Sequence, residues 1–185
     1  MKSIFYTDID EGPVMKIGVD SALHRPAEPL FLPDESHNCT ILLVPALRIS
    51  RLGKCIPPAK AAEYYDAATV AAVFLTPASW GLQPLTADDT LTLGRWLPAD
   101  SLPAEASAAV SALDGTLLQP AQKWPTGLTA HAAATAVAHA SRHMTLKNGD
   151  VILLARAAYR IAPPQCDTLI DADLGAENVL SLKLK

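Results

Sequence analysis

A pair of histidines offers the first residue types and spacing in this sequence that could support chemistry. His139 and His143 lie four residues apart in the alanine-rich stretch 128–144, which predicts a helix, so both imidazoles share one face and could hold a metal ion. His131 extends the same stripe. A metal site would need a further ligand, and this stretch contains no carboxylate and no cysteine. We therefore interpret the stripe as a solvated polar face, opposite an apolar stripe that includes Val137.

Acidic residues in the middle of the chain are the next candidates. Asp88 and Asp89 are adjacent, and Glu63 and Asp66 precede them by about two dozen residues. Paired carboxylates act as acid and base when burial separates their pKa values. Adjacent aspartates in a loop more often cap the next element or face water, and we expect that role here.

The cysteines predict neither a disulfide bond nor a catalytic nucleophile. Cys39, Cys55 and Cys166 are odd in number and widely spaced, which argues against a disulfide framework and against CxxC metal knuckles. Lys54 precedes Cys55 and could lower a thiol pKa, but one sequence neighbour is a weak indication, so a structural thiol is expected. The sequence contains no GxSxG, HExxH, Walker A or GxGxxG motif.

Composition indicates a globular chain, with 50% hydrophobic and 18% charged residues. A net charge of -4 leaves no basic surplus for a nucleic-acid backbone, so we expect no nucleic-acid partner. Acidic residues enter the N-terminal stretch before any apolar run, which argues against a secretory signal and favours a cytoplasmic location. The uncharged stretch 67–87 is interrupted by prolines and a glycine, so it predicts a buried segment and not a membrane span.

The pattern of elements predicts an α+β fold that is mainly β, organised as one domain over residues 1–185. Helices are expected over 58–68, after Pro57-Pro58, and over 128–144. Two hairpins are expected, one turning at residues 10–13 and one at Asp114-Gly115. Pro45 falls inside a strand-like run and favours an edge or a bulge there. The strand-like runs are 3–9, 13–20, 39–50, 69–77, 90–98, 150–162, 167–174 and 178–185.

Two segments together resemble the fumarylacetoacetate hydrolase family: RLGKCIPPAKAAEYYDAATVAAVF at 51–74 and SRHMTLKNGDVIL at 141–153. Weaker similarity is found in EPLFLPDES at 28–36 and ALDGTLLQP at 112–120, in the family's order. The resemblance implies a mixed β-sandwich or roll with two short helices, in which residues 1–27 form a divergent N-terminal hairpin region. It also implies homodimers, and Mg2+ or Mn2+ held by a Glu-x-Glu strand and a later Asp. In such a site the metal chelates a 2-oxo or β-diketo acid while an N-terminal histidine moves a proton.

The chain departs from the family's pattern at these functional positions. At the family's spacing the two glutamate positions fall on Pro45 and Leu47, and the aspartate position falls on Val73. Only His24 offers a substitute for the family's histidine, and it is a weak catalytic candidate. A Gly-Thr-Pro turn that lines the family's substrate site is replaced by Ala155, Arg156 and Ala157.

These departures lead to one main hypothesis and two alternatives. The main hypothesis is a non-catalytic homologue that has lost its divalent-metal site, needs no cofactor and takes at most a small carboxylate ligand, because Pro, Leu and Val offer no oxygen ligand. The first alternative is an active hydrolase, isomerase or decarboxylase of a 2-oxo acid that uses relocated ligands such as Glu35, Asp66 or Asp88. The second is a structural subunit that pairs with an intact paralogue.

Overall fold

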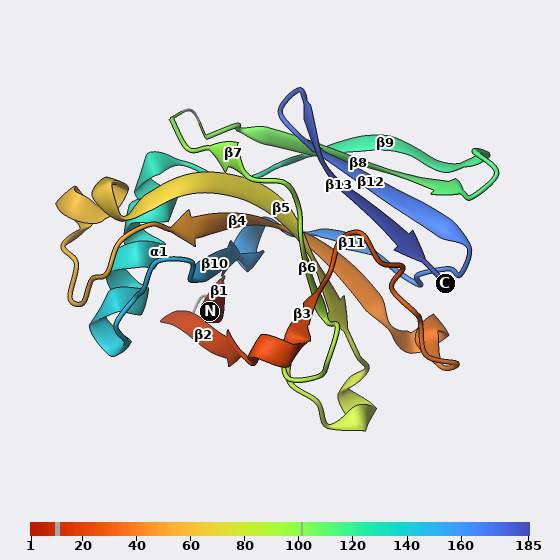
Figure 1. Cartoon of the computed structure of the whole chain (residues 1–185), viewed down its shortest axis with the longest axis horizontal. Coiled ribbons are helices and arrows are strands. Elements are labelled where there is room, and N and C mark those ends of the chain that lie inside the picture. The colour runs from red at the N-terminus through yellow and green to blue at the C-terminus, as the bar shows by residue number, and fades with distance from the viewer. Residues whose placement is uncertain (10–11, 101) are drawn as a thin grey trace.

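Two β-sheets and one α-helix dominate the computed structural model, which describes residues 1–9, 12–100 and 102–185 (Figure 1). The expected mainly β fold of the α+β class is confirmed. The strands are β1 (Ser3–Ile9), β2 (Gly12–Gly18), β3 (Leu23–His24), β4 (Thr40–Ile49), β5 (Tyr65–Leu75), β6 (Leu91–Leu93), β7 (Leu97–Pro98), β8 (Glu105–Ala112), β9 (Leu117–Pro125), β10 (Val151–Leu154), β11 (Tyr159–Ile161), β12 (Thr168–Leu174) and β13 (Glu177–Leu184). The helix is α1 (Ala130–His143), and short 3₁₀ helices are η1 (Asp20–Ala22), η2 (Ser36–Asn38), η3 (Pro58–Tyr64), η4 (Ala78–Trp80) and η5 (Ala155–Ala157).

The larger sheet is mixed and strongly curled. Its strands follow the order β2-β1-β10-β4-β5-β6-β3, with β11 added to β4 and β7 added to β5. The pairs β1–β10 and β3–β6 are parallel, and the other pairs are antiparallel. The smaller sheet has the order β13-β12-β8-β9 and lies above the arch of β4 and β5, with α1 at one end (Figure 1).

The strands β4 and β5 are apolar on both faces of the large sheet. On one face Leu43 and Leu47 of β4 join the buried alanines of α1 and the inward side chains of the small sheet in one cluster, here called the helix-side cluster. On the other face, around which the sheet curls, lies a second cluster, here called the inner cluster. It consists of Phe5, Ala22, Leu42, Val44, Ala46, Ala71, Val73, Leu85, Leu91, Val151 and Leu153.

Pro45 lies inside β4, where the sequence predicted an edge or a bulge. The strand is interior, because β5 pairs along its whole length and β10 and β11 pair on its other side. Pro45 is opposite Val70, whose carbonyl accepts from the Gly94 amide on the far side of β5, so this pair exchanges no hydrogen bond. The imino nitrogen therefore points into the gap between β10 and β11, where the ladder is already broken.

Two predicted elements differ in extent. The helix expected over 58–68 is the 3₁₀ helix η3, which ends at Tyr64 because β5 begins at Tyr65 to pair with Ile49. The strand expected over 90–98 is divided into β6 and β7, since the amide of Arg95 turns away to donate to Val179 of the small sheet at 2.6 Å.

The helix expected over 128–144 is confirmed as α1. Thr129 caps its start, with the hydroxyl accepting from the Ala132 amide at 3.0 Å, and Ala133, Val137 and Ala140 are buried as the apolar stripe predicted. None of the helices among the described residues combines the length and apolar character that a bilayer crossing requires.

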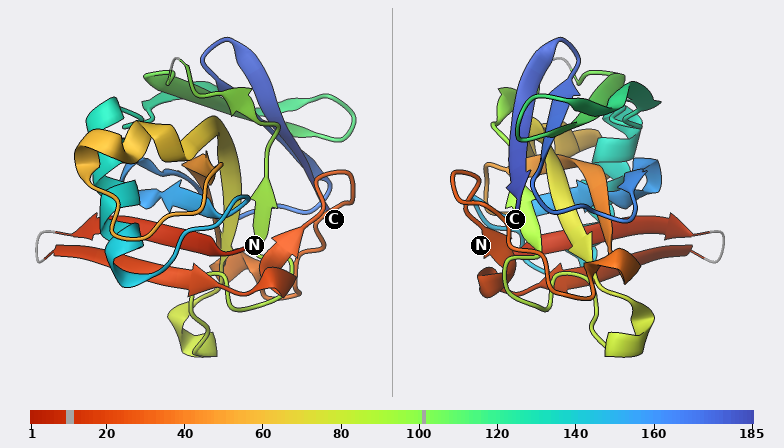
Figure 2. Two further views of the ribbon diagram at one scale, coloured as in Figure 1. Left: turned by 60° about the vertical axis from the view of Figure 1, so that its left-hand side comes forward. Right: turned by 90° about the vertical axis from the view of Figure 1, so that its right-hand side faces the viewer.

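Both predicted hairpins form. β1 and β2 pair from Ser3 with Gly18 to Ile9 with Gly12, and Figure 2 shows them side by side at the lower edge of the large sheet. The residues of their turn at 10 and 11 lie outside the described residues. β8 and β9 flank the Asp114-Gly115 turn, where the Asp114 carboxylate accepts from the Thr116 amide and this bond lowers the pKa of Asp114.

Asp150 joins the starts of two strands of the large sheet, β1 and β10, through one buried carboxylate. Its side chain is 2% exposed and accepts from the Lys147 amide and the Lys2 amide at 2.8 Å each, while the Lys2 ammonium lies 2.6 Å away. Gly149, with a φ of +85°, makes the turn that presents this carboxylate. The Leu-Lys-Asn-Gly-Asp motif thus has a structural role: it fixes the start of β10 against the start of β1.

We predict that Asp150→Ala lowers the free energy of unfolding by about 2–4 kcal/mol, because it leaves two backbone donors and a lysine without their acceptor. Urea denaturation measures the change. The control Asp20→Ala removes a largely exposed carboxylate that lies 3.5 Å from the N-terminal amine, and should cost less than about 0.5 kcal/mol. Equal unfolding midpoints for the two variants would contradict this role of Asp150.

Candidate functional site

The three positions predicted to correspond to former metal ligands do not share one face of the sheet. Leu47 belongs to the helix-side cluster, and Pro45 lies two residues before it on the same face of β4. Val73 belongs to the inner cluster, on the opposite face, and is paired with Leu42. The structure therefore brings Val73 together with Leu42 and Val44, and not with Pro45 and Leu47. The residue spacing that assigned these positions, counted from Gly53-Lys54, does not show on which face of the sheet each side chain lies.

The surroundings of Val73 do not suit a divalent metal ion. Mg2+ and Mn2+ require oxygen ligands, usually including carboxylates, and the residues that pack with Val73 in the inner cluster, among them Leu42 and Leu91, supply none. Within residues 1–9, 12–100 and 102–185, no three His, Cys, Asp or Glu side chains gather closely enough to hold a metal ion.

His24 is buried and has a structural environment. Its Nε2 lies 2.9 Å from the carbonyl oxygen of Glu28, and its Nδ1 lies 3.2 Å from a carboxylate oxygen of Asp89. The contact with Asp89 ties β3 to the loop before β6, and His24 does not line the cavity between β1, β9, α1 and η5.

The other acidic and thiol candidates lie apart from one another. Asp66 forms a two-point ion pair with Arg48, at 2.9 and 3.0 Å, and this hydrogen bonding raises the pKa of Arg48. Glu63 contacts Lys60 at 3.2 Å, while Asp88 and Glu35 are exposed in separate loops.

Of the cysteines, Cys39 is buried and Cys55 and Cys166 are exposed. Burial raises the pKa of Cys39, whereas Cys55, the position predicted to carry a structural thiol, is exposed.

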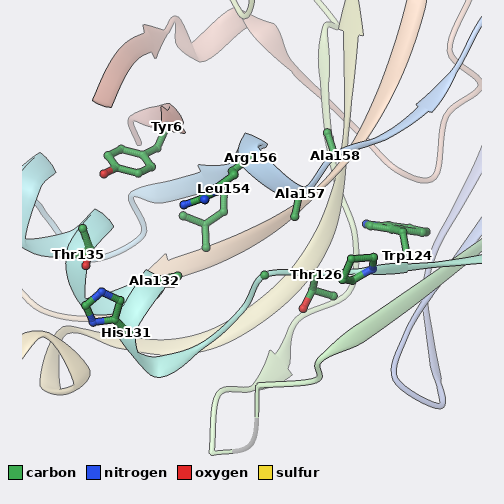
Figure 3. A pocket seen from close by; sticks show the side chains of 12 residues that line it. Tyr6, Trp124, Thr126, His131, Ala132, Thr135, Leu154, Arg156, Ala157 and Ala158 are labelled. Carbon is green, nitrogen blue, oxygen red and sulfur yellow. The ribbon is translucent and has the colours of Figure 1, made fainter. Parts of the chain in front are cut away.

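A cavity lies where β1, the end of β9, the start of α1 and η5 meet (Figure 3). Its volume is about 490 Å³. Its polar or aromatic lining residues are Tyr6, Trp124, Thr126, His131, Thr135 and Arg156, and Leu154, Ala132 and Ala157 supply apolar wall. Two residues of the predicted substrate-site turn, Arg156 and Ala157, therefore do line a cavity, together with His131 of the helix.

Trp124 is one of the residues that line this cavity. The residue is 7% exposed, and its ring stacks on Tyr159 with a centroid separation of 5.1 Å and an interplanar angle of 22°. Its indole nitrogen is buried and has no hydrogen-bond partner among the described residues. Sequence reasoning missed this residue, although a lone tryptophan in the strand LLQPAQKWP could have drawn attention.

The hydroxyl of Thr126 and the backbone of Gly127 shape the floor of the cavity. Thr126 Oγ1 donates to the carbonyl of Pro103 at 2.7 Å and accepts from the amide of Leu128 at 3.1 Å. Gly127 has a φ of +63°, and a Cβ there would lie 3.2 Å from the Cβ of Ala157. The link from β9 to α1 is thus held close against η5.

The histidine stripe of α1 is less uniformly solvated than predicted. His131 and His143 are exposed, but His139 is half-buried, with its ring 5.8 Å from the Tyr6 ring and its Nδ1 without a partner among the described residues. Burial lowers the pKa of His139, and the charges of His143 and Arg142 lower it further. The curl of the large sheet brings Tyr6 onto this face, which helical spacing alone does not reveal.

Comparisons with known proteins show a shared fold. No family sequence model matches the chain, and no curated protein matches it significantly in sequence. Among solved structures, 5-carboxymethyl-2-hydroxymuconate delta-isomerase from Mycobacterium smegmatis superposes with a TM-score of 0.76 at 21% identity, over 99% of this chain and 78% of that one. A 2-hydroxyhepta-2,4-diene-1,7-dioate isomerase from Mycobacterium marinum gives 0.80 at 21% identity, over 99% and 73%.

A protein from Yersinia pestis that is named for the fumarylacetoacetate hydrolase family gives a TM-score of 0.75 at 16% identity, over 100% of this chain and 93% of that one. The expected fumarylacetoacetate hydrolase fold is therefore confirmed over essentially the whole chain. At these identities the likeness concerns the fold, and the chemistry has to be argued from the side chains.

We predict that His139 makes folding stability depend on pH. Because its folded pKa lies below the unfolded value of about 6.5, the unfolded state binds more protons as the pH falls through that value, so stability decreases from about pH 7 to about pH 5. In His139→Asn this decrease should be smaller, as measured by urea denaturation at both pH values. His37→Asn, which removes an exposed histidine, should retain the full decrease. Parallel pH profiles for wild type and His139→Asn would refute the prediction.

Proposed function

We propose that this protein is a divergent homologue of the fumarylacetoacetate hydrolase family that acts by binding and not by metal-dependent catalysis. The observation that carries the proposal is the inner cluster, in which Val73 packs among buried hydrocarbon side chains. Val73, Leu42 and Val44 face the same space, and the strands that hold them are paired without a bulge at these positions. A divalent ion placed there would lose its hydration oxygens and gain none from these side chains.

Burial explains how such a cluster is maintained once a metal is no longer held. An unpaired carboxylate in this position would cost several kcal/mol, whereas a fully buried Leu or Val contributes about 1.5–3 kcal/mol. Selection for stability alone therefore favours the apolar side chains that occupy the inner cluster.

The alternative, an active enzyme on a 2-oxo or β-diketo acid with relocated ligands, receives less support from the positions of the acids. Asp66 is engaged by Arg48, and Glu35 and Asp88 occupy separate exposed loops. The three carboxylates would have to leave these places to surround one ion.

Calorimetric titration of the purified protein with Mg2+ and with Mn2+ tests the proposal, together with a turnover assay on a panel of acylpyruvates and oxaloacetate with and without each ion. The proposal predicts no saturable binding of either ion and no turnover. Stoichiometric binding accompanied by metal-dependent turnover would establish the alternative.

We further predict that Val73→Asp lowers the free energy of unfolding by at least about 3 kcal/mol, because the new carboxylate is buried without a partner. Urea denaturation with and without Mn2+ measures both the loss and any recovery. The matched control Val14→Asp lies on the exposed edge strand β2 and should cost no more than about 1 kcal/mol. If Mn2+ restores the stability of Val73→Asp, the inner cluster still forms a metal cavity and the proposal is wrong.

A further inference from the structure

We propose that His139 and His143 form an open chelating site for a divalent transition-metal ion of the Zn2+ and Cu2+ class at the C-terminal end of α1. The two imidazoles are the protein ligands, and water fills the remaining coordination positions. This site differs from the positions discussed for Mg2+ or Mn2+, since it uses nitrogen ligands on a helix and no residue of β4 or β5. The inference therefore goes beyond the proposed function and is tested independently of it.

The separation of the two rings suits a chelate. His139 and His143 are four residues apart in α1, so their side chains are neighbours on one face, and their ring centroids lie 5.0 Å apart. With metal–nitrogen bonds of about 2.0–2.1 Å, an ion bound to one nitrogen of each ring lies roughly 3.2 Å from each centroid, which gives an angle of about 100° at the ion. Such an angle is close to that of tetrahedral coordination. The χ2 torsion of histidine is broad, so each ring can turn a nitrogen towards a shared ion.

Both imidazoles are available as ligands. The Nδ1 atom of His139 is buried without a hydrogen-bond partner among the described residues, and His143 forms no hydrogen bond or ion pair within the described part of the chain. Burial lowers the pKa of His139, so its ring is neutral at pH 7 and has the lone pair that a metal ion requires. The Tyr6 ring lies 5.8 Å from the His139 ring and limits its movement, which reduces the entropy that this ligand loses on binding.

The position on the helix favours a cation. The pair lies at the C-terminal end of α1, where the helix dipole is negative. Arg142 lies between the two histidines in sequence and opposes a bound ion by its charge. Its side chain is exposed, so water and salt screen that repulsion.

The ligand set selects the class of ion. Imidazole suits Zn2+, Cu2+ and Ni2+, whereas Mg2+ and Mn2+ prefer oxygen ligands. No third His, Cys, Asp or Glu of the described residues gathers with this pair, so the other positions are left to water. We therefore expect an exchangeable site that binds Cu2+ more tightly than Zn2+, and Zn2+ more tightly than Mn2+.

A Zn2+ titration of full-length ¹⁵N-labelled protein near neutral pH tests the site. The variant Cys55→Ser/Cys166→Ser is used as the background, because exposed thiols also bind Zn2+. Long-range ¹H–¹⁵N spectra report the ring nitrogens of each of the 5 histidines, and His139→Asn and His143→Asn assign the signals of the pair. We expect the signals of His139 and His143 to move together and to saturate at one equivalent of Zn2+.

Calorimetry on matched variants of the same helix measures the contribution of each ring. His139→Asn and His143→Asn should each weaken Zn2+ binding at least about tenfold, because a single imidazole cannot chelate. His131→Asn removes an exposed histidine two turns before His139 and should leave the affinity unchanged. Because His143 is exposed, His143→Asn tests the site without disturbing the packing around Tyr6.

Three results would overturn the inference. The first is the absence of any response of the His139 and His143 signals up to about 1 mM Zn2+, or a response of only one of them. The second is an equal loss of affinity in His131→Asn and His143→Asn. The third is binding of Mn2+ to the pair as tightly as Zn2+, since two imidazoles without a carboxylate should not favour the harder ion.

Discussion

The burial of β4 and β5 on both faces is the constraint on which the rest of the structure depends. One face packs against α1 and the small sheet, and the other is enclosed by the curl of the large sheet itself. A strand in that position has no solvent face, so alternation between polar and apolar residues is replaced by a continuous apolar run, as in TILLVPAL. A charged side chain on either face would need a partner, and the inner cluster provides none. On the inner face, the strand pair that builds the core therefore presents no oxygen ligand from Leu42, Val44 or Val73.

The segments that most resemble the fumarylacetoacetate hydrolase family serve the scaffold. Gly53 of the first segment and Leu146 of the second exchange two backbone hydrogen bonds, at 2.8 and 3.0 Å, and a Cβ on Gly53 would collide with the ring of Tyr64 at 2.5 Å. Asp150 in the second segment fixes β10 against β1. These interactions concern folding and do not depend on a metal. Retention of these motifs is thus compatible with the loss of a catalytic centre elsewhere on the same sheets.

Local patterns in the sequence predicted those elements whose stability is local. The capped alanine-rich helix α1 and the Asp114-Gly115 hairpin formed as expected, because a cap and a turn act within a few residues. The extent of η3 was not predictable in this way, since pairing of Tyr65 with Ile49 decides where β5 begins. The resemblance supplied the fold, which periodicity could not have given.

The positions of the candidate site residues depended more on tertiary contacts than those of the local elements did. Spacing placed Pro45, Leu47 and Val73 in one constellation, but the pleat puts Val73 on the opposite face. Similarly, the burial of His139 by Tyr6 and the role of Trp124 arise from segments more than 30 residues apart, as the numbering of these residues shows. Arg156 and Ala157 do border a cavity, as the predicted turn suggested, but that cavity lies on the helix side of the sheet.

Anomalous diffraction from crystals soaked in Mn2+ tests the central claim most directly, because it locates any bound ion without reference to activity. If the inner cluster is a closed apolar core, the anomalous map will show no peak near Val73, Leu42 or Val44, and these side chains will remain in contact. A manganese peak among these residues, at the roughly 2.0–2.6 Å ligand distances of hard divalent ions, would contradict the account.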